Sequence, residues 1–360
     1  MKINSKGEME ESIPATVCFD DVLLKPGYSK IESRSEVSLI SQLGSHELEL
    51  PLISSPMDTV TESSMTAAMF LCGGLGIIHR YNTIDEQQKH IEEAWEAMAD
   101  EFLGSPDDFD PLIGAAVGVS GDYLERASAC VASGATILCV DVAHGHHVLV
   151  KKALKKLKKK FGKSVHIMAG NVATLEAFND LADWGADSVR VGVGGGSICS
   201  TRIQTGHGIP TLQSVIDCAK SDRDASLVAD GGFKTSGDIV KALAAGADCV
   251  MLGSLLAGTN EAPGDIFENL NGDKYKAYRG MASPEAQMEW RGSTSSLEGV
   301  ATTIPYKGGV HFILGELERG IRSGLSYTGA RTLPELQARA SFIRQTAAGQ
   351  IESSTHILRR

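Results

Sequence analysis

A glycine-rich segment that ends in a cysteine is the part of the chain best suited to chemistry. Residues 189–201 read VRVGVGGGSICST, so that a β-branched run leads into clustered glycines and then into Ser197, Cys199 and Thr201. Glycines leave backbone N–H groups bare and accessible to an anion such as phosphate. A thiol beside hydroxyls and amide dipoles becomes a nucleophile where its thiolate is stabilised. Glycine-rich loops also merely turn the chain, and Ser197 stands where a dinucleotide fingerprint has its third glycine, so the segment alone does not identify a ligand.

Eight short apolar runs supply the framework that must position this segment. Each run is followed by a polar or glycine-rich loop and then by a helical pattern, which predicts a parallel sheet. Three of the predicted helices end in the motifs SGAT, WGAD and AGAD. The glycine in each motif is expected to adopt the left-handed backbone conformation that ends a helix. The number of runs and this punctuation favour an α/β fold of the closed (β/α)8 TIM-barrel type over an open doubly wound sheet. The runs cover residues 51–55, 75–79, 112–116, 136–141, 165–169, 187–191, 226–230 and 248–252.

The carboxyl ends of these runs carry polar residues that a barrel would bring to one rim. Chemistry in such barrels takes place at that rim, where phosphate is commonly bound by backbone amides after the last two strands. None of the runs ends in lysine, which argues against a Schiff-base aldolase. Beside the 192–201 loop, the rim residues include Ser55, Met57, Asp141, Asn171, Asp230, Gly232, Gly253 and Ser254.

Three stretches depart from the barrel rhythm. We expect residues 1–15 to form a flexible N-terminal arm and residues 16–360 to form a single catalytic barrel. The range 85–110 combines a helical stretch with an acidic tip and is predicted to be a short surface excursion. Residues 282–308 are polar and poor in core side chains, so they are predicted to form a mobile lid after the eighth strand, with a disordered linker as the alternative.

Composition excludes several classes of protein. The net charge of −11 argues against a nucleic-acid-binding protein, and no apolar run approaches the length of a membrane span. The lysine-rich run 150–160 has apolar residues at helical spacing, so it indicates the solvated face of a helix, with nucleic-acid contact as the alternative. Seven cysteines without CxxC spacing, and a polar start without a signal-peptide core, indicate reduced thiols in the cytoplasm. His144, His146 and His147 lack the partners of a metal site, which favours hydrogen bonding.

The 189–201 segment resembles the signature loop of the family that contains inosine-5'-monophosphate (IMP) dehydrogenase and guanosine-5'-monophosphate (GMP) reductase. The resemblance implies a barrel oxidoreductase that works at C2 of a purine nucleotide with a nicotinamide cofactor, NAD or NADPH, usually as a homotetramer. It covers about residues 16–357 and rests also on FDDVLL at 19–24, SSPMDTVTE at 54–62, GGLGIIHR at 73–80, VDVAHGH at 140–146, AGNVAT at 169–174, ADGG at 229–232 and YRGM at 278–281.

The same resemblance implies roles for individual residues. Cys199 would bond to C2 of the purine, and Thr201 and Glu298 would relay protons. The positions that match the substrate site are Ser55, Met57, Ser197, Asp230, Gly232, Gly253, Ser254, Tyr278 and Met281, and those that match the cofactor site are Asp141, Asn171 and Arg190. Carbonyls of Gly192, Gly194 and Cys199 match a K⁺ site, to which a neighbouring subunit contributes a segment that Glu352-Ser-Ser resembles.

The two activities of the family differ in their characteristic sequence motifs. PMDTVTE, GAAVGV, AHGHH, YRGM and AAGQIES resemble the dehydrogenase, although the chain lacks the tandem regulatory domain that many dehydrogenases carry. The lid lacks the adjacent Arg-Tyr pair that activates water in dehydrogenases, with Trp290-Arg291 as the sole candidate, while SRSEV at 33–37 and HIMAGNV at 166–172 resemble the reductase. We interpret the chain as an NAD-dependent IMP dehydrogenase that forms xanthosine monophosphate (XMP). The alternatives are an NADPH-dependent GMP reductase and a catalytically inactive nucleotide-binding barrel.

Overall fold

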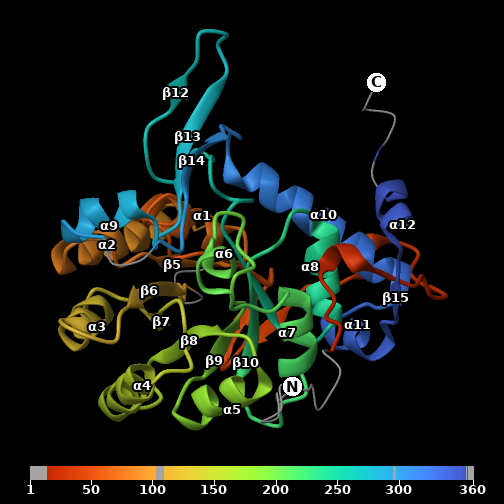
Figure 1. Ribbon diagram of the computed structural model, residues 1–360, viewed down its shortest axis with the longest axis horizontal. Helices are drawn as coiled ribbons and strands as arrows, with labels where there is room; N and C mark the ends of the chain where they lie inside the picture. The colour runs from red at the N-terminus through yellow and green to blue at the C-terminus, as the bar shows by residue number, and fades with distance from the viewer. Residues whose placement is uncertain (1–13, 103–108, 295–296, 354, 356–360) are drawn as a thin grey trace, which may run out of the picture.

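A closed barrel of eight parallel strands forms the centre of the molecule (Figure 1). The structure is a computed structural model and describes residues 14–102, 109–294, 297–353 and 355. Hydrogen bonding runs around the barrel in the order β10-β11-β4-β5-β6-β7-β8-β9. Each strand overlaps one of the eight apolar runs, so the predicted TIM barrel is confirmed. The strands are β4 (Leu52–Ser54), β5 (Leu75–Ile78), β6 (Ile113–Val117), β7 (Ile137–Asp141), β8 (His166–Val172), β9 (Ser188–Val191), β10 (Ser226–Asp230) and β11 (Cys249–Leu252).

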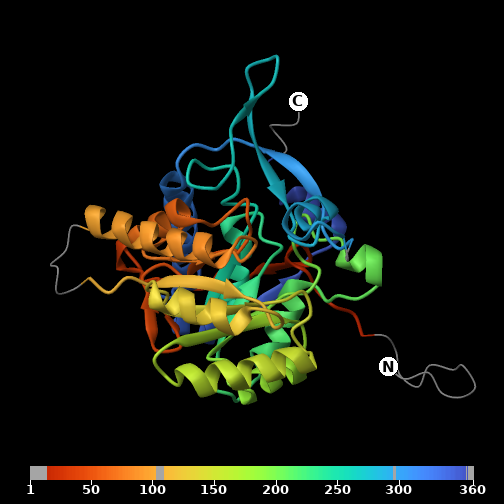
Figure 2. The same ribbon diagram turned by 90° about the vertical axis from the view of Figure 1, so that its left-hand side faces the viewer.

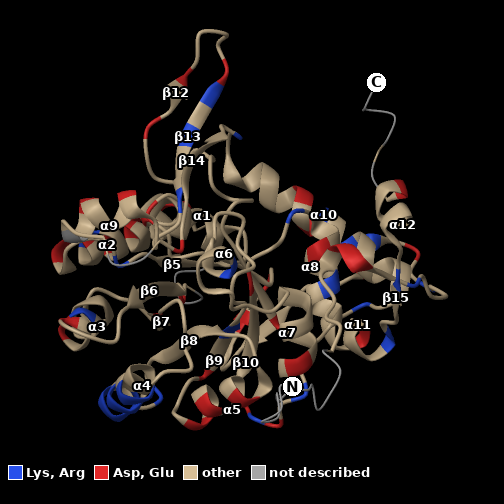
Figure 3. Cartoon of the chain, in the orientation of Figure 1, with Lys and Arg blue, Asp and Glu red and all other residues tan. Residues whose placement is uncertain are grey.

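Helices follow the strands and cover the outside of the barrel (Figures 1 and 2). They bury an apolar stripe and expose a polar one: in α4, Val150, Ala153, Leu154 and Leu157 are buried while most of its lysines are exposed, and the lysines colour this helix blue in Figure 3. Within the described part of the chain, no helix is long and apolar enough to cross a membrane. The helices of the barrel are α1 (Ser63–Leu71), α2 (Ile84–Glu101), α3 (Tyr123–Ala132), α4 (Val148–Phe161), α5 (Leu175–Asp183), α7 (Thr211–Cys218), α8 (Ser236–Ala244) and α10 (Val310–Thr328).

Two apolar cores hold these layers together. The larger core lies between the strands and the helices, and the smaller fills the barrel itself with inward side chains such as Ile77, Met168 and Met251. The hairpin of β2 (Ser41–Leu43) and β3 (His46–Leu48) adds Leu43 and Leu48 to the inner core. This hairpin closes the amino-terminal end of the barrel, which leaves the opposite rim as the accessible one.

The three helix-stopping glycines adopt the predicted conformation. Gly134, Gly185 and Gly246 have φ angles of 109°, 111° and 112°, in the region that favours glycine. Two residues after each of them, a polar side chain directly precedes the next strand. The motifs SGAT, WGAD and AGAD therefore end three helices in the same way.

Polar side chains at these junctions tie neighbouring strands together. The carboxylate of Asp187 accepts the N–H of Ile167 at 2.8 Å, while the N–H of Asp187 donates to the carbonyl of Ile167 at 2.7 Å. Asp248 makes the same pair of bonds with Leu227, at 2.7 and 2.9 Å. Because both partner strands are buried, each aspartate satisfies a backbone N–H that water does not reach.

A long insertion separates β11 from α10. It contains a small antiparallel sheet in the order β12-β13-β14, whose hairpin projects from the body of the molecule in both views (Figures 1 and 2). Ser283 caps α9 by accepting the N–H of Ala286. The predicted lid, 282–308, is therefore folded where it is described, and residues 295–296 lie outside the described part. The elements are β12 (Phe267–Glu268), β13 (Lys274–Arg279), α9 (Pro284–Arg291) and β14 (Ala301–Pro305).

The segment predicted to be a surface excursion is mostly a barrel helix. Helix α2 spans 84–101 and packs on α1 with Ile91, Ala94 and Met98 fully buried. Residues 103–108, which include most of the acidic tip, lie outside the described part of the chain, as do residues 1–13 of the predicted N-terminal arm.

Two strands from near the ends of the chain pair with each other beside the barrel. Strands β1 and β15 pair antiparallel, with Leu23 opposite Ile343. The remaining elements are the 3-10 helices η1 (Phe19–Asp21) and η2 (Arg34–Glu36), β1 (Val22–Leu24), α6 (Thr201–Thr205), α11 (Leu333–Arg339), β15 (Phe342–Arg344) and α12 (Ala347–Glu352).

The junction between α5 and β9 gives a test of this arrangement. Asp187→Ala removes the acceptor of the buried Ile167 N–H, and we expect the free energy of unfolding to fall by about 1–3 kcal/mol. Asp187→Asn keeps an oxygen in place and loses mainly the partly exposed ion pair with Lys158, so its loss should be smaller. Urea unfolding followed by circular dichroism measures both. Equal losses in the two variants would show that the N–H acceptor is unimportant.

Candidate active site

The 192–200 loop packs so closely on its neighbours that glycine is required. A Cβ at Gly192 would lie 2.0 Å from the carbonyl oxygen of Asp230, and one at Gly195 would lie 2.3 Å from Oγ1 of Thr211. Gly192 and Gly194 also have φ angles of 154° and 80°. The loop after β9 therefore packs directly against the end of β10. This packing places Cys199, which belongs to the loop after β9, over the mouth of the barrel.

Cys199 begins a chain of hydrogen bonds that ends at a carboxylate. Its sulfur donates to Oγ1 of Thr201 at 3.1 Å, and Thr201 donates to Oε2 of Glu298 at 2.8 Å. All three residues line the same pocket. A thiol, a hydroxyl and a carboxylate in this order give the thiol proton a path away from sulfur, as a nucleophile requires.

Backbone pairing between the loop and the lid brings Glu298 to this position. The N–H of Ser200 donates to the carbonyl of Glu298 at 3.0 Å, and the N–H of Val300 donates to the carbonyl of Ile198 at 3.0 Å. The hydroxyl of Ser200 adds a bond to the carbonyl of Leu297 at 2.8 Å. Residues nearly a hundred positions apart thus form a short antiparallel bridge, which fixes the carboxylate relative to the thiol.

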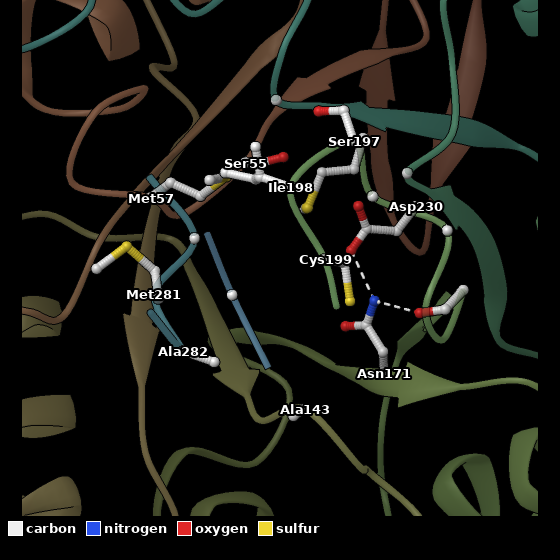
Figure 4. Close-up of a pocket in the computed structure, with 18 of the residues that line it drawn as sticks. Ser55, Met57, Ala143, Asn171, Ser197, Ile198, Cys199, Asp230, Met281 and Ala282 are labelled. Atoms are coloured by element: carbon white, nitrogen blue, oxygen red, sulfur yellow. Dashed lines mark hydrogen bonds between the residues drawn. The ribbon is translucent and has the colours of Figure 1, made fainter. Parts of the chain in front are cut away.

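A buried arginine joins the ends of four neighbouring barrel strands. The guanidinium of Arg190, from β9, donates to Asp141 at the end of β7 over 2.6 Å and to Asp230 at the end of β10 over 2.8 Å. Asn171, from β8, donates to Asp230 at 2.7 Å and to the carbonyl of Gly192 at 2.9 Å. Figure 4 shows Asn171 and Asp230 beside Cys199, whose sulfur faces the cavity. The network holds two carboxylates at fixed positions in the pocket that Cys199 lines.

The guanidinium of Arg190 stays protonated in spite of its burial. Burial lowers the pKa of this guanidinium, but Asp230, Cys139 and Asp141 raise it by more, so that the net pKa lies well above the ordinary value. Only 6% of Arg190 is exposed. A cation at this depth is stabilised by its paired carboxylates, and they in turn depend on the cation.

The opposite wall of the pocket offers hydroxyls and bare backbone. The hydroxyls of Ser197 and Tyr278 lie 3.3 Å apart. Burial raises the pKa of Tyr278, although hydrogen bonds to Ser197 and Ser254 lower it, so the phenol remains a donor. A Cβ at Gly253 would lie 3.2 Å from the Tyr278 hydroxyl, so glycine leaves room here for a ligand to approach the backbone. These groups suit a phosphate dianion.

Every residue that the sequence analysis assigned to the site lines one pocket of about 270 Å³. The catalytic set, the substrate set and the cofactor set meet there, with Met281 and Ala282 facing Cys199 across the cavity in Figure 4. The structure therefore brings the predicted residues together. These are Ser55, Met57, Asp141, Asn171, Arg190, Gly192, Gly194, Ser197, Cys199, Thr201, Asp230, Gly232, Gly253, Ser254, Tyr278, Met281 and Glu298.

Sequence reasoning missed Arg80 and Tyr81, which also line this pocket. The Arg80 guanidinium donates to the carbonyl of Asp141 at 3.1 Å and lies over the rings of Tyr81 and Trp290, at 4.9 and 5.8 Å from their centroids. Both missed residues stand just after the second barrel strand, β5, so their position at a strand end was an available signal.

The histidine cluster at 144–147 and the expected K⁺ site differ in what their polar groups bind. His146 bonds to Asp180 at 2.8 Å and His147 accepts the N–H of Leu149, so these two histidines make hydrogen bonds. Among the described residues, no group of three or more His, Cys, Asp or Glu could hold a metal ion. The carbonyl of Gly192, expected at a K⁺ site, already accepts a hydrogen bond from Asn171. A carbonyl has a second lone pair, so this bond does not block a cation.

The fold and the pocket define an α/β barrel with a hydrogen-bonded cysteine at its rim. Comparison with known proteins makes the assignment specific, because the family model for the IMP dehydrogenase / GMP reductase domain matches residues 16–356. The chain belongs to this family.

Individual relatives carry both names of the family. The inosine-5'-monophosphate dehydrogenase of Nitrosopumilus maritimus is 37% identical, over 94% of this chain and 97% of the relative. The GMP reductase of Leishmania major is 33% identical, over 96% and 97%. A variant of GMP reductase from Trypanosoma brucei, solved with guanosine 5'-monophosphate, matches the fold with a TM-score of 0.88 and 33% identity, over 96% of this chain and 98% of that one.

Replacing the buried arginine tests the network. Arg190→Met leaves Asp141 and Asp230 without their shared cation, and we expect the free energy of unfolding to fall by about 3–5 kcal/mol in urea titrations. Arg223 also contacts two aspartates, Asp183 and Asp222, but at the surface. Arg223→Met is thus a matched control that should lose much less. A loss in the control as large as that in Arg190→Met would contradict the assigned role.

Proposed function

We propose that this chain is an NAD-dependent IMP dehydrogenase, which oxidises IMP to XMP through a covalent bond between Cys199 and C2 of the purine. The hydrogen-bonded chain from Cys199 through Thr201 to Glu298 carries the proposal, because it places an activated sulfur in a pocket that also offers phosphate and ribose partners. The names of most relatives support the dehydrogenase direction.

The nucleotide binds with its phosphate away from the nucleophile. Ser197, Tyr278 and the backbone N–H groups at Gly232, Gly253 and Ser254 take the phosphate. Asp230 accepts from a ribose hydroxyl, since Arg190 and Asn171 hold its carboxylate without using all of its lone pairs. Ser55 and Met57 line the nucleotide side, and the backbone at Met281 faces the base.

The reaction proceeds in two halves at Cys199. The thiol passes its proton toward Thr201 and Glu298, and the sulfur bonds to C2 of IMP. C2 loses a hydride, which leaves a thioimidate on the enzyme. Glu298 then releases the thiol proton to solvent. Water adds to C2, one of its protons goes to the adjacent ring nitrogen, and Glu298 and Thr201 pass the other to sulfur as the carbon–sulfur bond breaks, which gives XMP and the free cysteine thiol. The bound nicotinamide supplies the hydride acceptor for the first half.

The residues around Asp141 fit a nicotinamide cofactor. The buried Nε of Arg80 has no hydrogen-bond partner, and Arg80, Tyr81 and Asp141 line one side of the pocket. A cation, an aromatic face and a carboxylate suit the phosphate, planar ring and ribose of such a cofactor. Asp141, Asn171 and Arg190 thus remain its proposed contacts. NAD follows from the dehydrogenase proposal, and NADPH would accompany the reductase.

GMP reductase is the second candidate, favoured by the lid. The structure carries Glu298 and Thr201 to Cys199, yet the lid sequence has no Arg-Tyr pair to activate water. In a reductase the sulfur bonds to C2 of GMP as ammonia leaves, with Thr201 and Glu298 protonating the departing amine. A hydride then adds to C2, the sulfur leaves, and IMP is released. This sequence requires no hydrolytic water.

Because the chain belongs to this family, we propose further properties for it. K⁺ would bind the carbonyls of Gly192, Gly194 and Cys199, with help from the segment at Glu352 of a neighbouring subunit. We propose a homotetramer in the cytoplasm, with no nucleic acid or membrane as partner. The chain acts as one catalytic barrel, with 282–308 as its lid.

Turnover with each substrate pair tests the activity. We expect IMP with NAD⁺ to raise absorbance of the reduced cofactor in the steady state, while GMP with NADPH gives no change. The Cys199→Ser variant should bind the nucleotide as the native chain does and lose about 10³-fold or more in kcat, because phosphate and ribose contacts do not involve sulfur.

The contrary outcomes separate the alternatives. Oxidation of NADPH with GMP would assign the reductase. Nucleotide binding without turnover of either pair would indicate an inactive barrel. Undiminished turnover by Cys199→Ser would remove this residue from the mechanism.

A further inference from the structure

The turn that follows β11 is irregular yet buried. Leu256, Ala257 and Thr259 are fully buried in this turn, which connects the phosphate-side residues Gly253 and Ser254 with the rest of the insertion. Buried backbone without regular structure must find hydrogen-bond partners for its carbonyl groups, since water does not reach them. Where these carbonyls bond therefore decides how the turn is held.

Two of these carbonyls bond to a lysine behind the turn. The ammonium of Lys307 donates to the carbonyl oxygens of Ser254 and Leu255, the latter at 3.1 Å, and its own backbone N–H donates to the carbonyl of Gly258 at 2.8 Å. Lys307 does not line the pocket. Burial lowers the pKa of this lysine to about 8, so its contacts are made at the cost of desolvation.

A second lysine holds the far end of the same turn. Lys276, only 3% exposed, donates to the carbonyls of Thr259, at 3.1 Å, and Ala262. Lys276 and Tyr278 are two residues apart on β13, so they point to the same face of that strand. One strand thus presents a hydroxyl near Gly253, at the start of the turn, and an ammonium at its end.

We infer that Lys307 and Lys276 are positioning residues for the phosphate end of the nucleotide site. The two ammonium groups turn the carbonyls of the 254–262 segment away from the pocket, which keeps the adjacent backbone N–H groups and Ser254 directed toward the ligand. They also place positive charge behind a site that receives a dianion. The inference rests on the proposed nucleotide site and adds the groups that preorganise it.

Calorimetric titration with a nucleoside monophosphate and with the matching nucleoside tests this role. For Lys307→Met we expect the Kd of IMP to rise about 10- to 100-fold, as for loss of a supporting contact, with the Kd of inosine almost unchanged. The KM for IMP should rise with kcat within about threefold, since the lysine does not touch the reacting atoms. Lys274→Met, at the exposed first residue of β13, is the matched control and should change neither constant.

The outcomes distinguish this inference from the proposed function. Native chain that binds IMP no more tightly than inosine would overturn the nucleotide site itself. If the native chain binds IMP more tightly than inosine and Lys307→Met leaves the ratio of the two Kd values unchanged, only the role of the lysine would be overturned. An equal rise in the Kd of IMP and of inosine would overturn that role as well. If Lys307→Met does not fold, Lys276→Met tests the second lysine of the same turn, and a Kd for IMP equal to the native value in that variant would also overturn the inference.

Discussion

The rim of this barrel depends on one buried cation. Arg190 lies between Asp141 and Asp230, and with Asn171 it connects the ends of β7, β8, β9 and β10. A guanidinium buried this deeply is tolerable only while both carboxylates are present, and each carboxylate is fixed in direction by the guanidinium. The same network fixes the directions of Asp230 and Asp141, which we propose contact the nucleotide and the cofactor. In this proposal, structural stability and substrate recognition share the same contacts.

Around this network, distant segments must meet for chemistry to occur. Residues 198–200 pair with 297–300 of the lid, so Glu298 reaches Thr201 only when the lid lies against the loop. Assembly of the proton path is thus coupled to the position of the lid. On the phosphate side, Lys307 and Lys276 from the insertion hold the turn after β11. In the proposed site, the long insertion therefore contributes to both the catalytic end and the phosphate end of one pocket.

Much of this architecture was predictable from the sequence, and the exceptions have physical reasons. The eight strands are apolar runs with local punctuation, and strand ends gather at one rim, so Asp141, Asn171 and Asp230 followed from position. Glu298 was identified only by resemblance, because its pairing with the loop is non-local. Helix α2 was interpreted as part of an excursion, although Ile91, Ala94 and Met98 recur at helical spacing. Arg80 and Tyr81 were missed although they stand just after β5, because their contacts with Asp141 and Trp290 join residues distant in sequence.

The central claim is that the sulfur of Cys199 bonds to C2 of a purine nucleotide during turnover. Acid quenching in the steady state, followed by tryptic digestion and mass spectrometry, tests it directly. Cleavage after Arg190 and Arg202 isolates a peptide in which Cys199 is the sole cysteine. We predict a mass increase on this peptide that corresponds to the purine monophosphate when the chain turns over IMP with NAD⁺. An unmodified peptide during active turnover, or the nucleotide attached to a different cysteine, would contradict the account.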